Sequence, residues 1–116
     1  MIREEVAGPG RFYLALDDDE GLAGYAGSWF DGDVAQVMTI GVATRAQRCG
    51  LGRALLRGLV EQARTDRATA VFLEVAVTNE PALGLYRSEG FEVLARRPRY
   101  YQPEDVDAWS MRLRLG

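Results

Sequence analysis

The 116-residue chain contains no histidine and no lysine, and it has a single cysteine. The lack of histidine excludes Ser-His-Asp catalysis, Cys-His catalysis and histidine-ligated zinc. The lack of lysine excludes a P-loop and Schiff-base chemistry. A lone cysteine cannot form an intramolecular disulfide and fits a reducing compartment. We therefore expect a cytoplasmic protein, in which tyrosine is among the few remaining side chains that can donate a proton.

Long apolar runs and an excess of positive charge are also absent. No stretch approaches the ~18 consecutive apolar residues of a membrane span, and the first ten residues (MIREEVAGPG) do not resemble a secretory signal. The net charge of −3 argues against a general nucleic-acid-binding protein. The length fits one domain over residues 1–116 with one hydrophobic core. Any anion-binding site in this acidic chain must therefore be local.

Hydrophobic patterning predicts a mixed sheet with helices packed on it. One helix has an apolar face from Leu51 to Ala63, and a shorter one begins at Thr78 or Asn79 and ends before Gly90. Residues 1–10 are expected to be a loose lead-in. The predicted order is βββαβαββ, an α/β fold. Its six strands are expected over 11–16, 22–30, 34–42, 70–77, 91–97 and 108–115.

Residues 47–53 (QRCGLGR) join a predicted strand to a predicted helix. The first turn of a helix leaves backbone amides without acceptors, and the helix dipole makes that end positive. Gly50 and Gly52 let an anion approach the backbone, and Arg48 and Arg53 add positive charge. These features predict a phosphate site, but a tight turn with solvated arginines explains the same residues. A dinucleotide-binding fingerprint is excluded, because no third glycine follows at the required position.

Glu74 interrupts the apolar segment 70–77 (AVFLEVAV), where a solvent-facing carboxylate is not expected. A buried carboxylate without a partner is costly and keeps its proton more readily than one in water. That property suits a general base that takes a proton from an ammonium group. The alternative is a structural glutamate paired with one of the arginines. On the residues alone, both interpretations stay open.

Several motifs in the right order resemble those of the GNAT N-acetyltransferase superfamily. Residues 47–52 (QRCGLG) resemble its acetyl-coenzyme A motif, and residues 73–75 (LEV), Asn79 and residues 85–91 (LYRSEGF) resemble its later signatures. The match runs from about residue 11 to the end of the chain. The resemblance implies a GNAT-like, mostly antiparallel mixed sheet with two helices.

The carboxyl-terminal part of the chain resembles one group within that superfamily. Residues 96–101 (RRPRYY), followed by Asp107, Ala108 and Met111, are similar to RimI-type N-terminal acetyltransferases. Members of that group acetylate the amino-terminal alanine of a small-subunit ribosomal protein. The implied activity is direct transfer from acetyl-CoA to the α-amine of a protein.

The resemblance also indicates a departure near the amino terminus. Family members usually have another strand and two helices before the strand that we place at 11–16, and here only about ten residues precede it. We therefore expect the domain to lack that strand and those helices, which usually form one wall of the acceptor groove. An uncovered sheet edge favours association, so a homodimer is one hypothesis.

The resemblance assigns acetyl-CoA as the co-substrate and no metal. The pantetheine arm would pair with the strand at Ile40, Gly41 and Val42, and an amide near Val42 would polarise the thioester carbonyl. Asn79 matches a family position that hydrogen-bonds the coenzyme, and a helix cap is the alternative. The pyrophosphate would bind backbone amides of Arg48, Cys49, Gly50, Leu51, Gly52 and Arg53.

The resemblance makes Glu74 the general base and Tyr86 the general acid that protonates the leaving thiolate. Tyr100 and Tyr101 would line the acceptor groove and orient the peptide. On the residues alone, Tyr86 can also pack in the core, and Tyr100 and Tyr101 can cover the sheet.

Three functions stay open at this point. The first is a protein N-terminal acetyltransferase, with neither nucleic acid nor membrane among its partners. The second is a GNAT enzyme acting on a lysine side chain or a small-molecule amine. The third is a coenzyme-binding module with little or no catalysis. The residues 100–101 and 107–108 favour the first over the second, and the short amino-terminal region keeps the third open.

Overall fold

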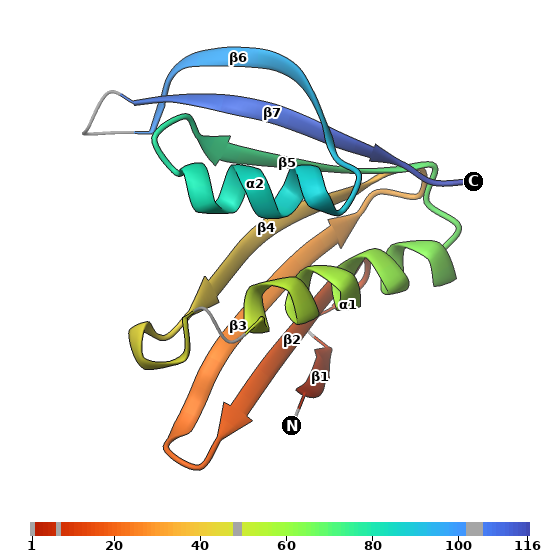
Figure 1. Cartoon of the computed structure of the whole chain (residues 1–116). Coiled ribbons are helices and arrows are strands. Elements are labelled where there is room, and N and C mark those ends of the chain that lie inside the picture. Colours follow the sequence, from red (N-terminus) through yellow and green to blue (C-terminus); the bar gives the residue numbers. More distant parts are fainter. Residues whose placement is uncertain (1, 7, 48–49, 102–105) are drawn as a thin grey trace.

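The computed structural model describes residues 2–6, 8–47, 50–101 and 106–116, with only the backbone described for Val6, Tyr100 and Tyr101. It forms one seven-stranded sheet with the order β1-β2-β3-β4-β5-β7-β6 and two α-helices (Figure 1). In the described part of the chain, neither helix has the length and apolarity needed to cross a membrane. The elements are β1 (Ile2–Val6), β2 (Arg11–Asp18), β3 (Gly21–Phe30), β4 (Ala35–Val42), the 3-10 turn η1 (Thr44–Ala46), α1 (Leu51–Thr65), β5 (Ala70–Ala76), α2 (Glu80–Ser88), β6 (Glu92–Tyr101) and β7 (Val106–Arg114).

The predicted fold class is confirmed, but two predictions about the amino terminus were wrong. Residues 2–6 are not a loose lead-in, because β1 pairs antiparallel with β2 from Ile2 opposite Leu16 to Val6 opposite Phe12. The sheet therefore has seven strands rather than six, and a strand does precede the one predicted at 11–16. The pattern gave no signal because β1 is an exposed edge strand with no buried face to impose an apolar alternation. No helix is present among the described residues between β1 and β2, which are 8–10.

The centre of the sheet is split between β4 and β5. These two strands are parallel and pair only at Ala35 opposite Val71 and Gln36 opposite Phe72, after which they diverge (Figure 1). A bulge in β4 marks the point of separation. Gly27 lies opposite Thr39 and Ser28 opposite Val37, which leaves Met38 as the extra residue. Because a bulge bends its strand and interrupts the ladder, β4 leaves β5 at this residue.

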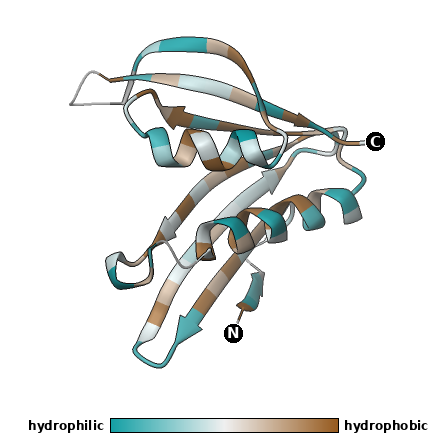
Figure 2. Ribbon diagram, viewed as in Figure 1, coloured by the Kyte–Doolittle hydropathy of each residue, from teal (hydrophilic) through white to brown (hydrophobic). Residues whose placement is uncertain are grey.

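Both helices pack on one face of the sheet. The apolar stripe of α1 is buried against β2, β3 and β4, and the apolar side of α2 packs against β5 and β7, as the hydrophobic bands in Figure 2 indicate. Val37 and Ile40 of β4 contact both clusters. Burial of these side chains supplies most of the driving force for folding. The largest fully buried side chains are Leu55, Leu56, Leu59, Val71, Leu73 and Met111.

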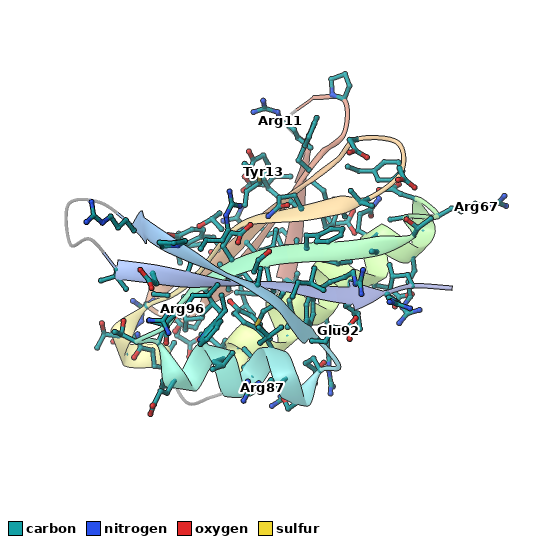
Figure 3. The ribbon with its side chains drawn as sticks, turned by 90° about the horizontal axis from the view of Figure 1, so that it is seen from above. Arg11, Tyr13, Arg67, Arg87, Glu92 and Arg96 are labelled. Carbon is teal, nitrogen blue, oxygen red and sulfur yellow. The ribbon has the colours of Figure 1, made fainter. Side chains whose placement is uncertain are left out.

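The opposite face of β2, β3 and β4 carries aromatic rings that lie flat on the strands. Tyr13 covers Gly27, which is directly opposite it, and Tyr25 covers Gly41 in the same way. A methyl group at either glycine would come within 2.6 Å of a ring atom. In Figure 3, Tyr13 projects from the sheet on the side away from α2. No helix in the described part of the chain covers this face.

The carboxylate of Glu89 joins the two helices. It follows the last turn of α2, is 13% exposed, accepts a hydrogen bond from Arg57 Nε at 2.7 Å and is paired with Arg53. The Arg57 guanidinium, with a further contribution from Arg53, holds the pKa of Glu89 below its usual value despite its desolvation. This cluster fixes α2 relative to α1, and both helices border the divergent strands.

We expect Glu89→Gln to lower the urea midpoint of unfolding at pH 7, because it removes a carboxylate shared by two guanidinium groups. The pKa of Glu89 is lower in the folded state than its unfolded value of about 4.5. Its contribution to stability is therefore present above pH 4.5 and is lost as the pH falls through the folded pKa. The variant should therefore lose less stability than the wild type on acidification below about pH 4.5. Urea titrations over this range measure the difference, with exposed Glu61→Gln as the control. Equal acid slopes for Glu89→Gln and wild type would contradict the assignment.

Candidate active site

A cleft of about 330 Å³ lies where β4 and β5 separate. Its walls are residues 37–40 of β4 and residues 73–76 of β5, together with Asn79 and Tyr86. The structure therefore brings four of the predicted site residues to one place, namely Ile40, Glu74, Asn79 and Tyr86.

Glu74 lies on the sheet face that the helices do not cover. Its neighbours on β5, Leu73 and Val75, are buried with the helices, and alternate residues of a strand point to opposite faces. The Glu74 side chain is 13% exposed, and its Oε1 lies 3.3 Å from Nη1 of Arg97 on β6. An arginine thus pairs with Glu74, as the structural alternative predicted, while the carboxylate also lines the cleft. Its catalytic role stays a prediction.

Tyr86 reaches the same cleft from the helix face. It lies on α2 and packs against the apolar cluster of β5 and β7, with its ring centroid 6.1 Å from that of Phe91. The Tyr86 ring therefore packs against the core, as the alternative interpretation predicted, and the residue also lines the cleft. Glu74 and Tyr86 consequently border one opening from opposite faces of the sheet.

The edge of β4 that faces the cleft presents backbone groups. Ala43 N donates to Ala23 O at 2.7 Å, and Val42 lies opposite Gly24. Hydrogen-bonded and non-hydrogen-bonded pairs alternate along antiparallel strands, so the amides of Ile40 and Val42 point away from β3. No strand in the described chain pairs with this edge beyond Gln36.

These positions suit a ligand that carries amide groups, but they differ in their access to the cleft. Ile40 lines the cleft with Glu74, whereas Val42 does not, and the Val42 carbonyl accepts a hydrogen bond from Gln47 Nε2 at 3.4 Å. The amide nearest to the reacting carbonyl is therefore expected at Ile40 rather than near Val42.

The start of α1 presents backbone amides at the turn where the sequence predicts a phosphate site. Gly50 is the N-cap with φ 76°, a left-handed conformation that glycine adopts without strain. The first bond within the helix is Ala54 N to Gly50 O at 3.1 Å, so the amides of Leu51, Gly52 and Arg53 precede any intrahelical acceptor. No side chain of the described residues caps this end. Amides in this arrangement, at the positive end of a helix dipole, bind phosphate groups.

Of the two arginines predicted to add charge at this turn, the structure describes Arg53. The Arg53 guanidinium is directed to the end of α2, where it donates to Ser88 Oγ at 2.9 Å and pairs with Glu89. Its backbone amide, by contrast, lies in the first turn of α1. The positions predicted at Arg48 and Cys49 lie outside the described residues.

The remaining predicted residues have mixed outcomes. Asn79 Oδ1 accepts from Ala82 N at 3.3 Å, so the helix-cap interpretation is confirmed, while Asn79 also lines the cleft. Tyr100 and Tyr101 end β6, and their side chains lie outside what the structure describes. Asp107 of the RimI-like tail accepts from the amide of Arg99 at 2.9 Å and from Arg96. These two partners hold the pKa of Asp107 below its usual value.

Met38 and Arg97 are among the residues at the cleft that sequence reasoning did not assign to the site. Met38 lines the cleft because of the bulge, and no glycine or proline beside it signals a bulge. Arg97 reaches Glu74 across β7, because β6 pairs with β7 at the edge of the sheet. The arginine-rich sequence of residues 96–99 does not reveal this strand order.

We expect Gly50→Ala to weaken coenzyme A binding about tenfold, since an alanine in the left-handed region costs roughly 1–2 kcal/mol and disturbs the amides beside it. Isothermal titration with coenzyme A measures the dissociation constant. Gly84→Ala is the matched control, because Gly84 lies within α2, has no positive φ and has open space for a methyl group. Unchanged affinity in Gly50→Ala would exclude this turn from the coenzyme site.

Comparison with known proteins identifies the family. Residues 2–91 match the model of the acetyltransferase (GNAT) family. The chain belongs to the GNAT family. It is therefore an N-acetyltransferase that uses acetyl-CoA as co-substrate, and the resemblance drawn from the motifs is confirmed.

Several relatives of this GNAT enzyme are RimI-type proteins. N-alpha-acetyltransferase RimI of Mycobacterium tuberculosis is 41% identical over 119 residues, which cover 99% of this chain and 73% of that protein. A putative ribosomal protein bS18-alanine N-acetyltransferase of Bacillus subtilis is 36% identical, over 96% of this chain and 74% of that protein. The crystal structure of the Escherichia coli ribosomal-protein-S18-alanine N-acetyltransferase matches with a TM-score of 0.87 at 31% identity, over 95% of this chain and 72% of that one.

Proposed function

We propose that this GNAT enzyme acetylates the α-amine of a protein, with the amino-terminal alanine of a ribosomal protein as the acceptor class. The observation that supports it best is the placement of Glu74 and Tyr86 on opposite faces of one cleft. The names of the RimI-type relatives support the acceptor class. The proposal includes a cytoplasmic location, where ribosomal proteins are made.

The donor side of the cleft fits acetyl-CoA. The amides of residues 51–53 would bind the pyrophosphate, and the β4 edge at Ile40 and Val42 would pair with the amides of the pantetheine arm. Gly41, which lies between them, is covered by the Tyr25 ring on the other face. When bound, acetyl-CoA supplies an acyl thioester, and the Ile40 amide would polarise its carbonyl.

The acceptor side is the uncovered face, where Glu74 points. Glu74 would take a proton from the acceptor's ammonium group, directly or through water, and the freed amine would form the new C–N bond as the C–S bond breaks. The acylated nitrogen would then release its second proton to solvent, from which Tyr86 regains the proton that it gives to sulfur. Tyr86, on the helix face, would give its proton to the departing sulfur. Arg97 would hold the Glu74 carboxylate in place. Direct transfer needs both substrates in the cleft together.

Initial rates on three acceptor classes test this proposal. We would compare a peptide that starts with alanine, an amino-terminally blocked peptide with one lysine, and polyamines. The proposal predicts product with the first class only. Product with the lysine peptide or with polyamines would favour a lysine or small-amine acetyltransferase. Tight coenzyme binding without any product would favour a coenzyme-binding module.

A further inference from the structure

A second pocket lies on the uncovered face, beside the cleft. It has a volume of about 260 Å³, a mostly apolar lining and walls from three adjacent strands. Trp29 and Met38 are 45% and 61% exposed, which is unusual for side chains of this size. The lining residues are Arg11, Tyr13, Ser28, Trp29 and Met38.

Met38 connects this pocket to the cleft. As the bulged residue of β4, it lines both the cleft that contains Glu74 and the apolar pocket. Tyr13 lies over Gly27 on the same face to which Glu74 points. A chain whose α-amine lies at Glu74 can therefore continue over Met38 into the pocket without crossing the sheet.

The dimensions fit a short peptide segment. The pocket extends from β4 to β2, which is two strand spacings or about 10 Å, and an extended peptide covers this in about three residues. Arg11 lines the pocket from β2, the lining strand farthest from Met38, and its positive charge is opposite in sign to an acidic side chain.

We propose that this pocket binds residues two to four of the acceptor polypeptide, with an apolar side chain against Trp29 and Tyr13 and an acidic side chain near Arg11. The proposal rests on the proposed function, because it takes the α-amine to lie at Glu74. It makes the exposed face of β2, β3 and β4 the specificity surface of the enzyme.

Two alanine-starting peptides test it, one with apolar and acidic residues at positions two to four and one with glycine and serine there. Trp29→Ala should raise KM for the first peptide about tenfold, the discrimination expected of an apolar pocket, and leave kcat and the second peptide unchanged. Arg11→Gln, at an exposed position on β2, provides an independent test by raising KM for the acidic peptide only. Leu94→Ala removes an equally exposed apolar side chain on β6 and should change neither.

The outcomes separate the two proposals. If the wild type acetylates both peptides and Trp29→Ala and Arg11→Gln leave their KM values unchanged, the pocket proposal is wrong while the proposed function stands. If Trp29→Ala instead converts a dimer to a monomer in sedimentation, the face is an interface between copies, which also overturns it. If the wild type acetylates neither α-amine, the proposed function itself fails.

Discussion

Glu74→Gln should lower turnover by about 10²–10⁴-fold, the usual contribution of a general base. Glutamine keeps the size of the side chain and an oxygen that can accept from Arg97, but it cannot take the acceptor's proton. Coenzyme affinity should change little, because the coenzyme site that we propose lies at β4 and the start of α1. Initial rates on an alanine-starting peptide and calorimetry with coenzyme A measure the two quantities.

Two further variants distinguish a general base from a structural glutamate. Glu80→Gln alters an exposed carboxylate in the first turn of α2 and should leave the rate unchanged. Arg97→Gln removes the partner of Glu74 and leaves the carboxylate in place. If Glu74 acts only through that ion pair, Arg97→Gln should cost as much turnover as Glu74→Gln, and both should lower the melting temperature. A near-normal rate for Glu74→Gln would exclude it as the base.

Tyr86→Phe should lower turnover by about 10²-fold or more, with no loss of stability. Phenylalanine keeps the ring that packs near Phe91 and removes only the hydroxyl that would protonate the sulfur. Tyr25→Phe, on the uncovered face, is the control for loss of a tyrosine hydroxyl. Steady-state rates and thermal melts check the prediction. If Tyr86→Phe retains wild-type turnover, the leaving group obtains its proton elsewhere.

The spacing of apolar residues along the sequence predicts much of the fold. The helix beginning at Leu51 and the buried strand 70–76 have continuous apolar patterns, because each packs against a core that leaves little choice of residue. β1 was missed for the opposite reason, since its residues 2–5 are exposed. The two carboxyl-terminal strands were predicted, but β6 continues past Pro98 to Tyr101, beyond the predicted end at residue 97. An edge strand with a bulge accommodates a proline that a central strand would not.

The candidate site was predictable as a set of residues but not as a geometry. The motifs indicated Ile40, Glu74, Asn79 and Tyr86, and the structure places all four around one cleft. Which face each side chain occupies depends on the register of β5 and on the position of α2. Our expectation that the polarising amide lies at Ile40 rather than Val42 depends on where β4 leaves β5, near the bulge at Met38.

The central claim is that the cleft transfers acetyl to an α-amine that approaches from the Glu74 face. Its most direct test is one peptide with an amino-terminal alanine and an internal lysine, incubated with acetyl-CoA and the wild-type enzyme. Fragmentation mass spectrometry then locates the acetyl group. We expect it on the α-nitrogen of alanine only, at a rate that Glu74→Gln nearly abolishes. Acetyl on the lysine side chain, or equal α-acetylation by the Glu74→Gln variant, would contradict the account.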